Sequence, residues 1–300
     1  MSNLVFVTGD FCSGSTAVFT LFRKTGYYYC LYEPPHEKLR EYLLYDLRPE
    51  SSDNHFFLDS YYREFKGFKH ARALFNPKWG ASELRIPPDA EADDLYRYMN
   101  YVIGSAFGRA PRVMFKENRL AFRLGWIRAK FPNAKIVHIH RPKEDQWRSI
   151  VRRVQGHKRQ EDVGQGSVTF NGFNIATFCE DLKPTYPELD AKNFATGFDR
   201  FSALWTLSFE ENRKYSDISI DYRDLQRDFV NTAERLWQCL GVTGIDTPSL
   251  EQFLVKQEGK GAASKRPWTA GLSDLVDRVG RGYAYHRVRA ESRWRPQNSA

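Results

Sequence analysis

A turn near the start of the chain holds residue types able to bind a phosphate or a sulfate. It runs Gly9-Asp10-Phe11-Cys12-Ser13-Gly14-Ser15-Thr16. Apolar residues 4–7 before it predict a buried strand, and the helical spacing of Val18, Leu21 and Phe22 after it predicts a helix. Such a turn directs backbone N–H groups and a helix N-terminus at one point, which favours anion binding. An ordinary turn with Ser13 capping the helix is the alternative.

Within this turn, Gly9 and Gly14 have the spacing of a nucleotide phosphate loop. Ser15, however, stands where a loop for ATP or GTP has the lysine that reaches the β- and γ-phosphates, and Thr16 follows it. The turn therefore suits a shorter, diphosphate-like group better than a triphosphate with Mg²⁺.

Two charged residues end predicted strands and are expected at one edge of a sheet. The aromatic run 27–32 predicts a strand that stops at Glu33, and residues 112–116 predict another that ends at Lys116. In an open parallel sheet, ligands bind at the carboxyl ends of the strands, where the turn also lies. Glu33 is the candidate general base, and His36 is its rival. Helix capping by Glu33 and a strand-end ion pair at Lys116 are the structural alternatives.

A further strand and helix carry two more polar candidates, Arg141 and Ser149. Residues 135–141 predict a strand, and the apolar residues between 147 and 154 recur at helical spacing. Arg141 therefore comes at a strand end, and Ser149 lies eight residues further on, within the helix that follows.

The elements that position these residues alternate strand and helix, which predicts a three-layer α/β/α fold with a central parallel sheet, like that of P-loop NTPases. We expect one domain over residues 1–300. An aromatic-rich insertion at about 48–110 is expected over the active-site edge, partly lining an acceptor pocket, with most of its aromatics in the core and a helix over 94–105. The glycine-rich segment 156–185 predicts a mobile loop, and about 256–300 a basic loop and tail.

Composition narrows the class of protein. The chain has 300 residues, 41% of them hydrophobic, so it can bury a large core, and its net charge of +8 indicates an anionic partner. The four cysteines have no metal-type spacing, which predicts reduced thiols and no metal. Without a leader or a run of about 20 apolar residues, a cytoplasmic protein with no membrane span is expected. Oligomeric state is left open.

Several segments together resemble one enzyme family. They are Ser13-Gly14-Ser15-Thr16, Leu31-Tyr32-Glu33-Pro34, Phe115-Lys116, Ile136-Val137-His138-Ile139-His140-Arg141 with Ser149, Ile218-Ser219-Ile220-Asp221-Tyr222-Arg223-Asp224-Leu225, and Leu240-Gly241. This pattern is similar to that of the sulfotransferases that use PAPS (3′-phosphoadenosine 5′-phosphosulfate), in particular the carbohydrate and bacterial branch. It spans roughly residues 4–270, apart from the insertion and the segment of about 155–195.

The resemblance implies a function and a set of site residues. A sulfotransferase would move the sulfuryl group of PAPS in line to a hydroxyl acceptor and release PAP, without a metal. Carbohydrate, lipid, peptide tyrosine and small metabolite all stay open as acceptors. The family's loop for the 5′-phosphosulfate corresponds to Cys12, Ser13, Gly14, Ser15, Thr16 and Ala17, its 3′-phosphate residues to Arg141 and Ser149, and its basic closing loop to the segment with Lys265 and Arg266.

This chain departs from the family pattern at two places. Cys12 stands where the family usually has Arg or Lys, and Arg141-Pro142 where it usually has Arg-Asp-Pro. Because the missing loop cation commonly stabilises the bridging oxygen, another must do so. Lys116 is the first candidate, and Lys265 or Arg266 the second.

Two other functions remain as alternatives. A nucleotide kinase of related fold is disfavoured because Ser15 replaces the loop lysine. A basic nucleic-acid-binding protein is suggested by residues 147–153 and the C-terminal arginines, although we expect no nucleic-acid partner.

Overall fold

The computed structural model describes residues 3–36, 39, 61–154, 169–170 and 173–255, all within a compact unit formed by residues 1–262. Lys265, Arg266 and the rest of the predicted basic loop and tail lie outside the described residues, as do all four glycines of the segment 156–185.

The core of the fold is a parallel sheet of five strands in the order β2-β3-β1-β4-β7. The strands are β1 (Leu4–Thr8), β2 (Tyr29–Tyr32), β3 (Val113–Glu117), β4 (Lys135–His140) and β7 (Ile218–Asp221). Their short apolar runs are buried on both faces, as parallel strands require. The predicted α/β fold with a parallel sheet is thus confirmed, and the register pairs Tyr32 of β2 with Lys116 of β3.

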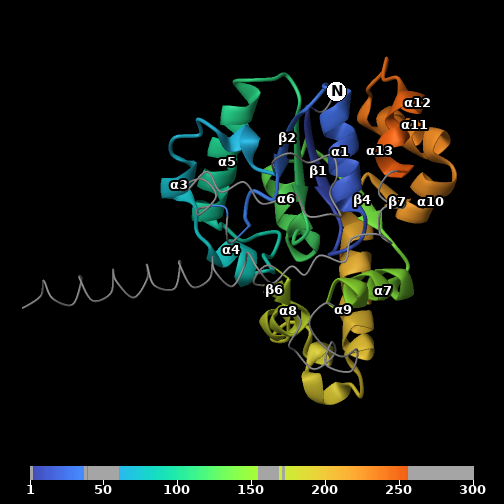
Figure 1. Ribbon diagram of the computed structural model, residues 1–300. Coiled ribbons are helices and arrows are strands. Elements are labelled where there is room, and N and C mark those ends of the chain that lie inside the picture. The colour runs from blue at the N-terminus through green and yellow to red at the C-terminus, as the bar shows by residue number, and fades with distance from the viewer. Residues whose placement is uncertain (1–2, 37–38, 40–60, 155–168, 171–172, 256–300) are drawn as a thin grey trace, which may run out of the picture. The chain divides into compact units, whose positions relative to one another are not determined.

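Helices cover both faces of the sheet (Figure 1). On one face α1 (Ser15–Thr25) and α11 (Phe229–Leu240) pack against residues such as Val5, Val7 and Ile139. On the other, α5 (Asp93–Phe107) and α6 (Leu124–Lys130) pack against Phe6 and Phe115. Successive strand residues point to opposite faces, so each strand contributes to both cores.

The described part of the insertion is helical and largely buried. It forms η1 (Arg63–Phe65), α3 (Ala71–Leu74), α4 (Lys78–Ala81) and α5, which confirms the helix predicted over 94–105. Phe65, Phe68, Phe75 and Trp79 lie in the core beneath it, as expected for most of its aromatics.

Part of the predicted mobile loop is a packed helix instead. Within 156–185, α8 (Ile175–Leu182) buries Phe178, Cys179 and Leu182 against Phe122. The prediction was wrong here because the glycines before this stretch hid an apolar spacing of i, i+3, i+4 and i+7.

The remaining described elements complete the unit. They are η2 (Ala121–Arg123), α7 (Lys143–Val154), β5 (Thr169–Phe170), β6 (Phe173–Asn174), η4 (Pro187–Leu189), η5 (Ala191–Asn193), α9 (Gly197–Tyr215), α10 (Tyr222–Arg227), α12 (Thr247–Leu250) and α13 (Gln252–Val255). The predicted strand and helix on either side of the glycine turn are both present, as β1 and α1. No helix in these described ranges has the length and apolar character needed to cross a membrane.

Candidate active site

The glycine turn between β1 and α1 has space for glycine alone at two positions. A Cβ on Gly9 would lie 2.3 Å from the carbonyl oxygen of Ile139 on β4. Gly14 has φ +100°, and a Cβ there would lie 2.3 Å from the ring of Tyr222. The turn is thus pressed against β4 and the start of α10, which fixes the direction of its backbone N–H groups.

The N-terminus of α1 opens into this turn without a side-chain cap. Gly14 occupies the cap position and Ser13 does not cap the helix, so the alternative of an ordinary Ser-capped turn is wrong. The Ser13 hydroxyl is buried and has no hydrogen-bond partner among the described residues. A buried hydroxyl in that state costs about 1–3 kcal/mol, which a ligand oxygen in the turn would recover.

A buried hydrogen-bond chain anchors the turn to α9. Ser208 donates to Asp10 Oδ1 at 2.6 Å, Asn212 donates to the backbone oxygen of Ser208 at 2.8 Å, and Thr8 donates to Asn212 Oδ1 at 2.9 Å. Burial raises the pKa of Asp10 to about 6, against the lowering effect of the Ser208 hydrogen bond. The start of the turn is therefore held by side chains some 200 residues away in sequence.

Cys12 is the residue of the turn that departs from the family pattern, and its surroundings are apolar. Its φ is +64°, in the left-handed region, and the side chain packs beside Ile150, Val151 and Phe201. Nearby, Gln146 donates to the backbone oxygen of Phe11 at 2.8 Å. Cys12 thus acts as a small packing residue between the turn and α7.

At the ends of β2 and β3, Glu33 and Lys116 form a buried ion pair. Lys116 Nζ donates to Glu33 Oε1, and the lysine side chain is 0% exposed. Nζ also lies 3.3 Å from the hydroxyl of Tyr32, which in turn is 3.2 Å from the Thr16 hydroxyl. The structure thus brings together the two residues that end predicted strands, although they are 83 positions apart in the sequence, and it places them beside α1.

The charges around Glu33 keep it ionised. Burial by itself would raise its pKa, but Lys116, His36 and Arg119 outweigh burial and lower the pKa to about 2. The pKa of Lys116 is lowered by burial, against the opposing effect of Glu33. Glu33 also has φ +41°, a backbone strain of the kind that gathers at functional sites.

His36, the rival base, faces inward. Its Nε2 lies 3.7 Å from Glu33 Oε2, and the residue is 5% exposed. The Tyr98 hydroxyl holds this segment by donating to the backbone oxygen of Pro34 at 2.7 Å. The two prolines therefore do not turn His36 away from the site, and both candidates remain in one cluster.

Asn118 also belongs to this cluster, although no sequence pattern singled it out. Its amide donates to Glu33 Oε1 at 2.7 Å, and its Oδ1 accepts from the Ser15 hydroxyl at 3.0 Å. The backbone N–H groups of Asn118 and Arg119 donate to Oε1 of the buried Glu117. Asn118 lies one residue past the end of β3, outside the apolar run that predicted the strand, so the strand-end pattern did not include it.

Arg141 and Ser149 lie on the other side of the turn, on the β4–α7 unit. The Arg141 guanidinium stacks over the ring of Tyr222 at 4.1 Å, and its buried Nε has no partner within the described ranges. Tyr222 also packs against Gly14, so one ring supports both the turn and the arginine. Ser149 is half-buried on α7, two turns beyond Arg141.

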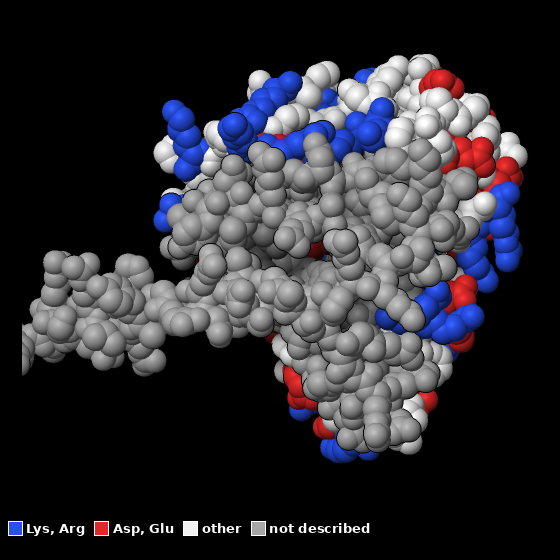
Figure 2. All heavy atoms as spheres, in the orientation of Figure 1, with Lys and Arg blue, Asp and Glu red and all other residues white. Residues whose placement is uncertain are grey.

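Surface charge is distributed differently from the buried cations of the site. Figure 2 shows Lys and Arg side chains along the upper rim of this face, near α5 and the start of β1 in Figure 1. Lys66, Lys69, Arg72 and Arg109 are exposed, whereas Lys116 is enclosed. The net positive charge is therefore not by itself a measure of charge at the site.

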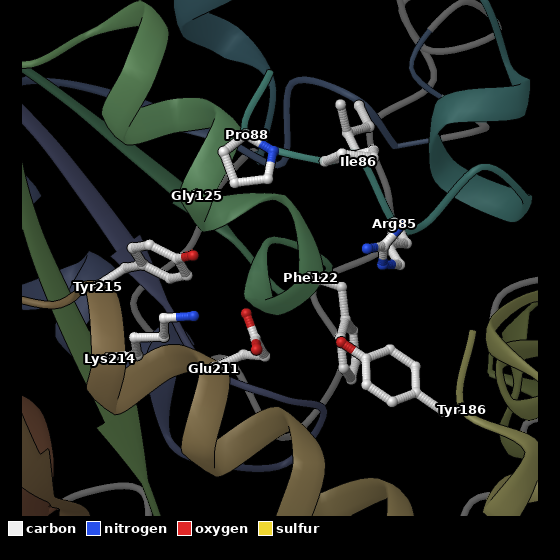
Figure 3. Close-up of a pocket in the computed structure, with 10 residues that line it drawn as sticks. Arg85, Ile86, Pro88, Phe122, Gly125, Tyr186, Glu211, Lys214 and Tyr215 are labelled. Carbon is white, nitrogen blue, oxygen red and sulfur yellow. The ribbon is translucent and has the colours of Figure 1, made fainter. Parts of the chain in front are cut away.

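The structure also contains a cavity of about 190 Å³ (Figure 3). It is lined by Arg85, Ile86, Pro87, Pro88, Phe122, Gly125, Tyr186, Glu211, Lys214 and Tyr215. The insertion contributes four of them, but no candidate catalytic or donor-binding residue lines it. In the described part of the chain, no group of three or more His, Cys, Asp or Glu side chains is placed to hold a metal ion.

Comparison with known proteins identifies a family for this chain. Residues 5–246 match the profile of the sulfotransferase family. Among solved structures, the chain is similar to sulfotransferase STF1 from Mycobacterium tuberculosis H37Rv (19% identity, 93% of this chain and 76% of that chain, TM-score 0.43). It is also similar to sulfotransferase STF9 from Mycobacterium avium (11% identity, 86% and 69%, TM-score 0.43). The comparison with curated proteins gives no match.

Proposed function

We propose that this chain, which belongs to the sulfotransferase family, transfers the sulfuryl group of PAPS to a hydroxyl acceptor and releases PAP. The observation that carries the proposal is the pairing of two features at one sheet edge. A helix N-terminus without a side-chain cap, where the Ser13 hydroxyl has no partner in the part of the chain that the structure describes, lies beside the buried Glu33–Lys116 pair. The first feature suits an anionic donor and the second suits proton transfer.

In this proposal the residues around the turn hold the donor. The backbone of residues 12–17, with the Ser13 hydroxyl, binds the 5′-phosphosulfate. Arg141 and Ser149 bind the 3′-phosphate, and the stacking of Arg141 on Tyr222 keeps the guanidinium at the turn. The loop lysine of ATP-binding proteins is not needed here, because PAPS has no γ-phosphate.

The reaction requires Glu33 and Lys116 to act separately. A carboxylate with a pKa near 2 is a weak base, and a lysine bound to it is not available to the donor. When the anionic donor draws Lys116 Nζ toward the bridging oxygen, the pKa of Glu33 rises. The acceptor oxygen then bonds to sulfur as the bond from sulfur to the PAP oxygen breaks, and the acceptor proton moves to Glu33.

The proposed acceptor is a hydroxyl-bearing molecule: a carbohydrate, a lipid, a peptide tyrosine or a small metabolite. In this proposal Lys116 leaves Glu33 only after the donor has bound. Donor binding is therefore the first step. The order is therefore part of the proposal, since an acceptor bound alone would meet a carboxylate whose pKa is still lowered by Lys116.

Thermal unfolding in the presence of three ligands tests this function. PAP should raise the midpoint temperature, whereas ATP with Mg²⁺ and duplex DNA should not, because binding to the native state alone stabilises it. Stabilisation by ATP with Mg²⁺ instead would favour a kinase, and stabilisation by DNA a nucleic-acid-binding protein. Incubation with PAPS labelled at sulfur and a panel of hydroxyl acceptors then identifies the product.

A further inference from the structure

We propose that Asn118 is a positioning residue that fixes one oxygen of Glu33 and joins it to the donor-binding turn through Ser15. This inference rests on the proposed function, because it takes Glu33 as the base and the turn as the donor site. It adds a residue that neither the family resemblance nor the strand-end pattern indicated.

The orientation of the Asn118 amide follows from the chemistry of its neighbours. An ionised Glu33 only accepts hydrogen bonds, so the atom 2.7 Å from its Oε1 must be the amide nitrogen. Oδ1 therefore faces the Ser15 hydroxyl, which donates to it at 3.0 Å. Each end of the amide thus has one partner, and flipping it would replace the hydrogen bond to Glu33 by a contact between two acceptor oxygens.

Asn118 and Lys116 both donate to the same oxygen of Glu33, Oε1. This leaves Oε2, which lies 3.7 Å from Nε2 of His36, to take the acceptor proton. When Lys116 turns to the donor, the Asn118 hydrogen bond still holds Oε1. The carboxylate therefore keeps its orientation at the step in which it must accept a proton.

The side chain of Glu117 fixes the backbone around Asn118. Oε1 of Glu117, a residue that is 2% exposed, accepts from the N–H groups of Asn118 at 2.9 Å and Arg119 at 3.2 Å. On the other side, Ser15 is the first residue of α1. A rigid strand end and a helix start thus hold the two ends of the Ser15–Asn118–Glu33 chain, and a shift in one is passed to the other.

Two substitutions separate positioning from simple packing. In Asn118→Ala the carboxylate loses its fixed orientation, so the rate should fall by about 10- to 100-fold while the Kd for PAP changes less than about threefold. In Asn118→Asp the shape stays but a second carboxylate faces Glu33, which raises the pKa of the pair. The acidic limb of the pH–rate profile should then move up by about one pH unit or more.

The readouts do not require a known acceptor. The rate is PAP released from PAPS with water as the acceptor, followed from about pH 5 to about pH 9, and the Kd for PAP comes from calorimetry. Asn231→Asp is the matched control, because exposed Asn231 also donates to a carboxylate, that of Asp228 at 2.9 Å. It should leave rate, profile and Kd unchanged.

The outcomes distinguish this inference from the proposed function. If the wild-type protein does not bind PAP, the proposed function fails, and if Glu33→Gln keeps its rate, the assignment of Glu33 as the base fails. If both of those tests succeed but Asn118→Asp keeps the wild-type pH profile, only the role of Asn118 is overturned. Thermal unfolding of each variant verifies the fold, and the isosteric Asn118→Asp decides the case should Asn118→Ala not fold.

Discussion

The two halves of the candidate site treat their polar groups in opposite ways. In the half formed by the turn and Arg141, buried polar atoms of Ser13 and Arg141 have no partner within the described residues. In the half formed by β2 and β3, Glu33 is bonded to both Lys116 and Asn118. The first half is therefore prepared for a ligand from outside, whereas the Glu33–Lys116 pair of the second half is satisfied until a ligand disturbs it, although Glu117 Oε2 at the end of β3 has no partner within the described ranges.

The largest expected effect concerns the half of the site formed by β2 and β3. Glu33→Gln keeps the shape and removes the basicity, so turnover of PAPS should fall by roughly 10²–10⁴ while PAP still binds. His36→Ala should cost much less, since Lys116 and Asn118 hold the carboxylate of Glu33 through Oε1 without it. Rates measured beside PAP affinities check this. Near-normal turnover in Glu33→Gln together with a large loss in His36→Ala would transfer the base to His36.

Removing the other member of the pair should be costly to stability. Lys116→Met leaves a buried, ionised Glu33 without its cation, which typically destabilises by about 3–5 kcal/mol. The double variant Glu33→Gln/Lys116→Met removes both charges and should recover most of that loss. Urea unfolding of the single and double variants measures the difference.

The exposed pair of Lys183 and Glu180 is the control for this experiment. Lys183→Met should change the unfolding free energy far less, because water already surrounds both groups. If Lys116→Met were as mild as Lys183→Met, the Glu33–Lys116 pair would be open to solvent, and the contrast between the two halves would disappear.

A substitution of Arg141 tests the half of the site formed by the turn and this arginine. Arg141→Ala should weaken PAP binding by about 1.5–3 kcal/mol, the value of a charged hydrogen bond. Binding of adenosine 5′-phosphosulfate, which lacks the 3′-phosphate, should barely change. Calorimetric titration of both nucleotides decides the matter, and equal losses would mean that Arg141 supports the turn through Tyr222 rather than binding one phosphate.

The sequence predicted the parts of the site that depend on sheet topology. Parallel strands end at one edge, and this alone brought Glu33 to Lys116 across the register pair of Tyr32 and Lys116. It did not predict Asn118, because the residue lies past the strand end in a turn shaped by backbone hydrogen bonds to Glu117. A contact of this kind leaves no periodic pattern in the sequence from which it could be predicted.

Burial of His36 was also beyond sequence reasoning. It depends on tertiary contacts with two segments far along the chain, the ring of Tyr62 at 6.4 Å and the hydroxyl of Tyr98 on Pro34. The role of Tyr222 is similar, since its segment entered only through the family resemblance, which did not indicate that the ring would support Gly14 and Arg141. Long-range packing of single side chains was thus what the patterns could not supply.

The smallest expected effect concerns Glu117, which supports Asn118 from below. Burial, with a further contribution from the charge of Glu33, raises its pKa from 4.5 to about 7, although Arg119, Lys116 and Arg123 oppose the shift. Because the folded protein then holds this proton more tightly than the unfolded chain, the stabilisation is complete below about pH 4.5 and is lost as the pH rises through 7.

Glu117→Gln removes this titration and keeps an oxygen for the N–H groups of Asn118 and Arg119. Relative to the wild type, the variant should therefore gain on the order of 1–3 kcal/mol of unfolding free energy between about pH 5 and about pH 8. Urea unfolding of both proteins at the two pH values measures it, and Asp10 titrates alike in both and cancels. The exposed Glu234→Gln should show no such difference. A Glu117→Gln variant that behaves like Glu234→Gln would show that Glu117 is ionised in the fold, and that the turn carrying Asn118 is held by a charge rather than by a neutral acid.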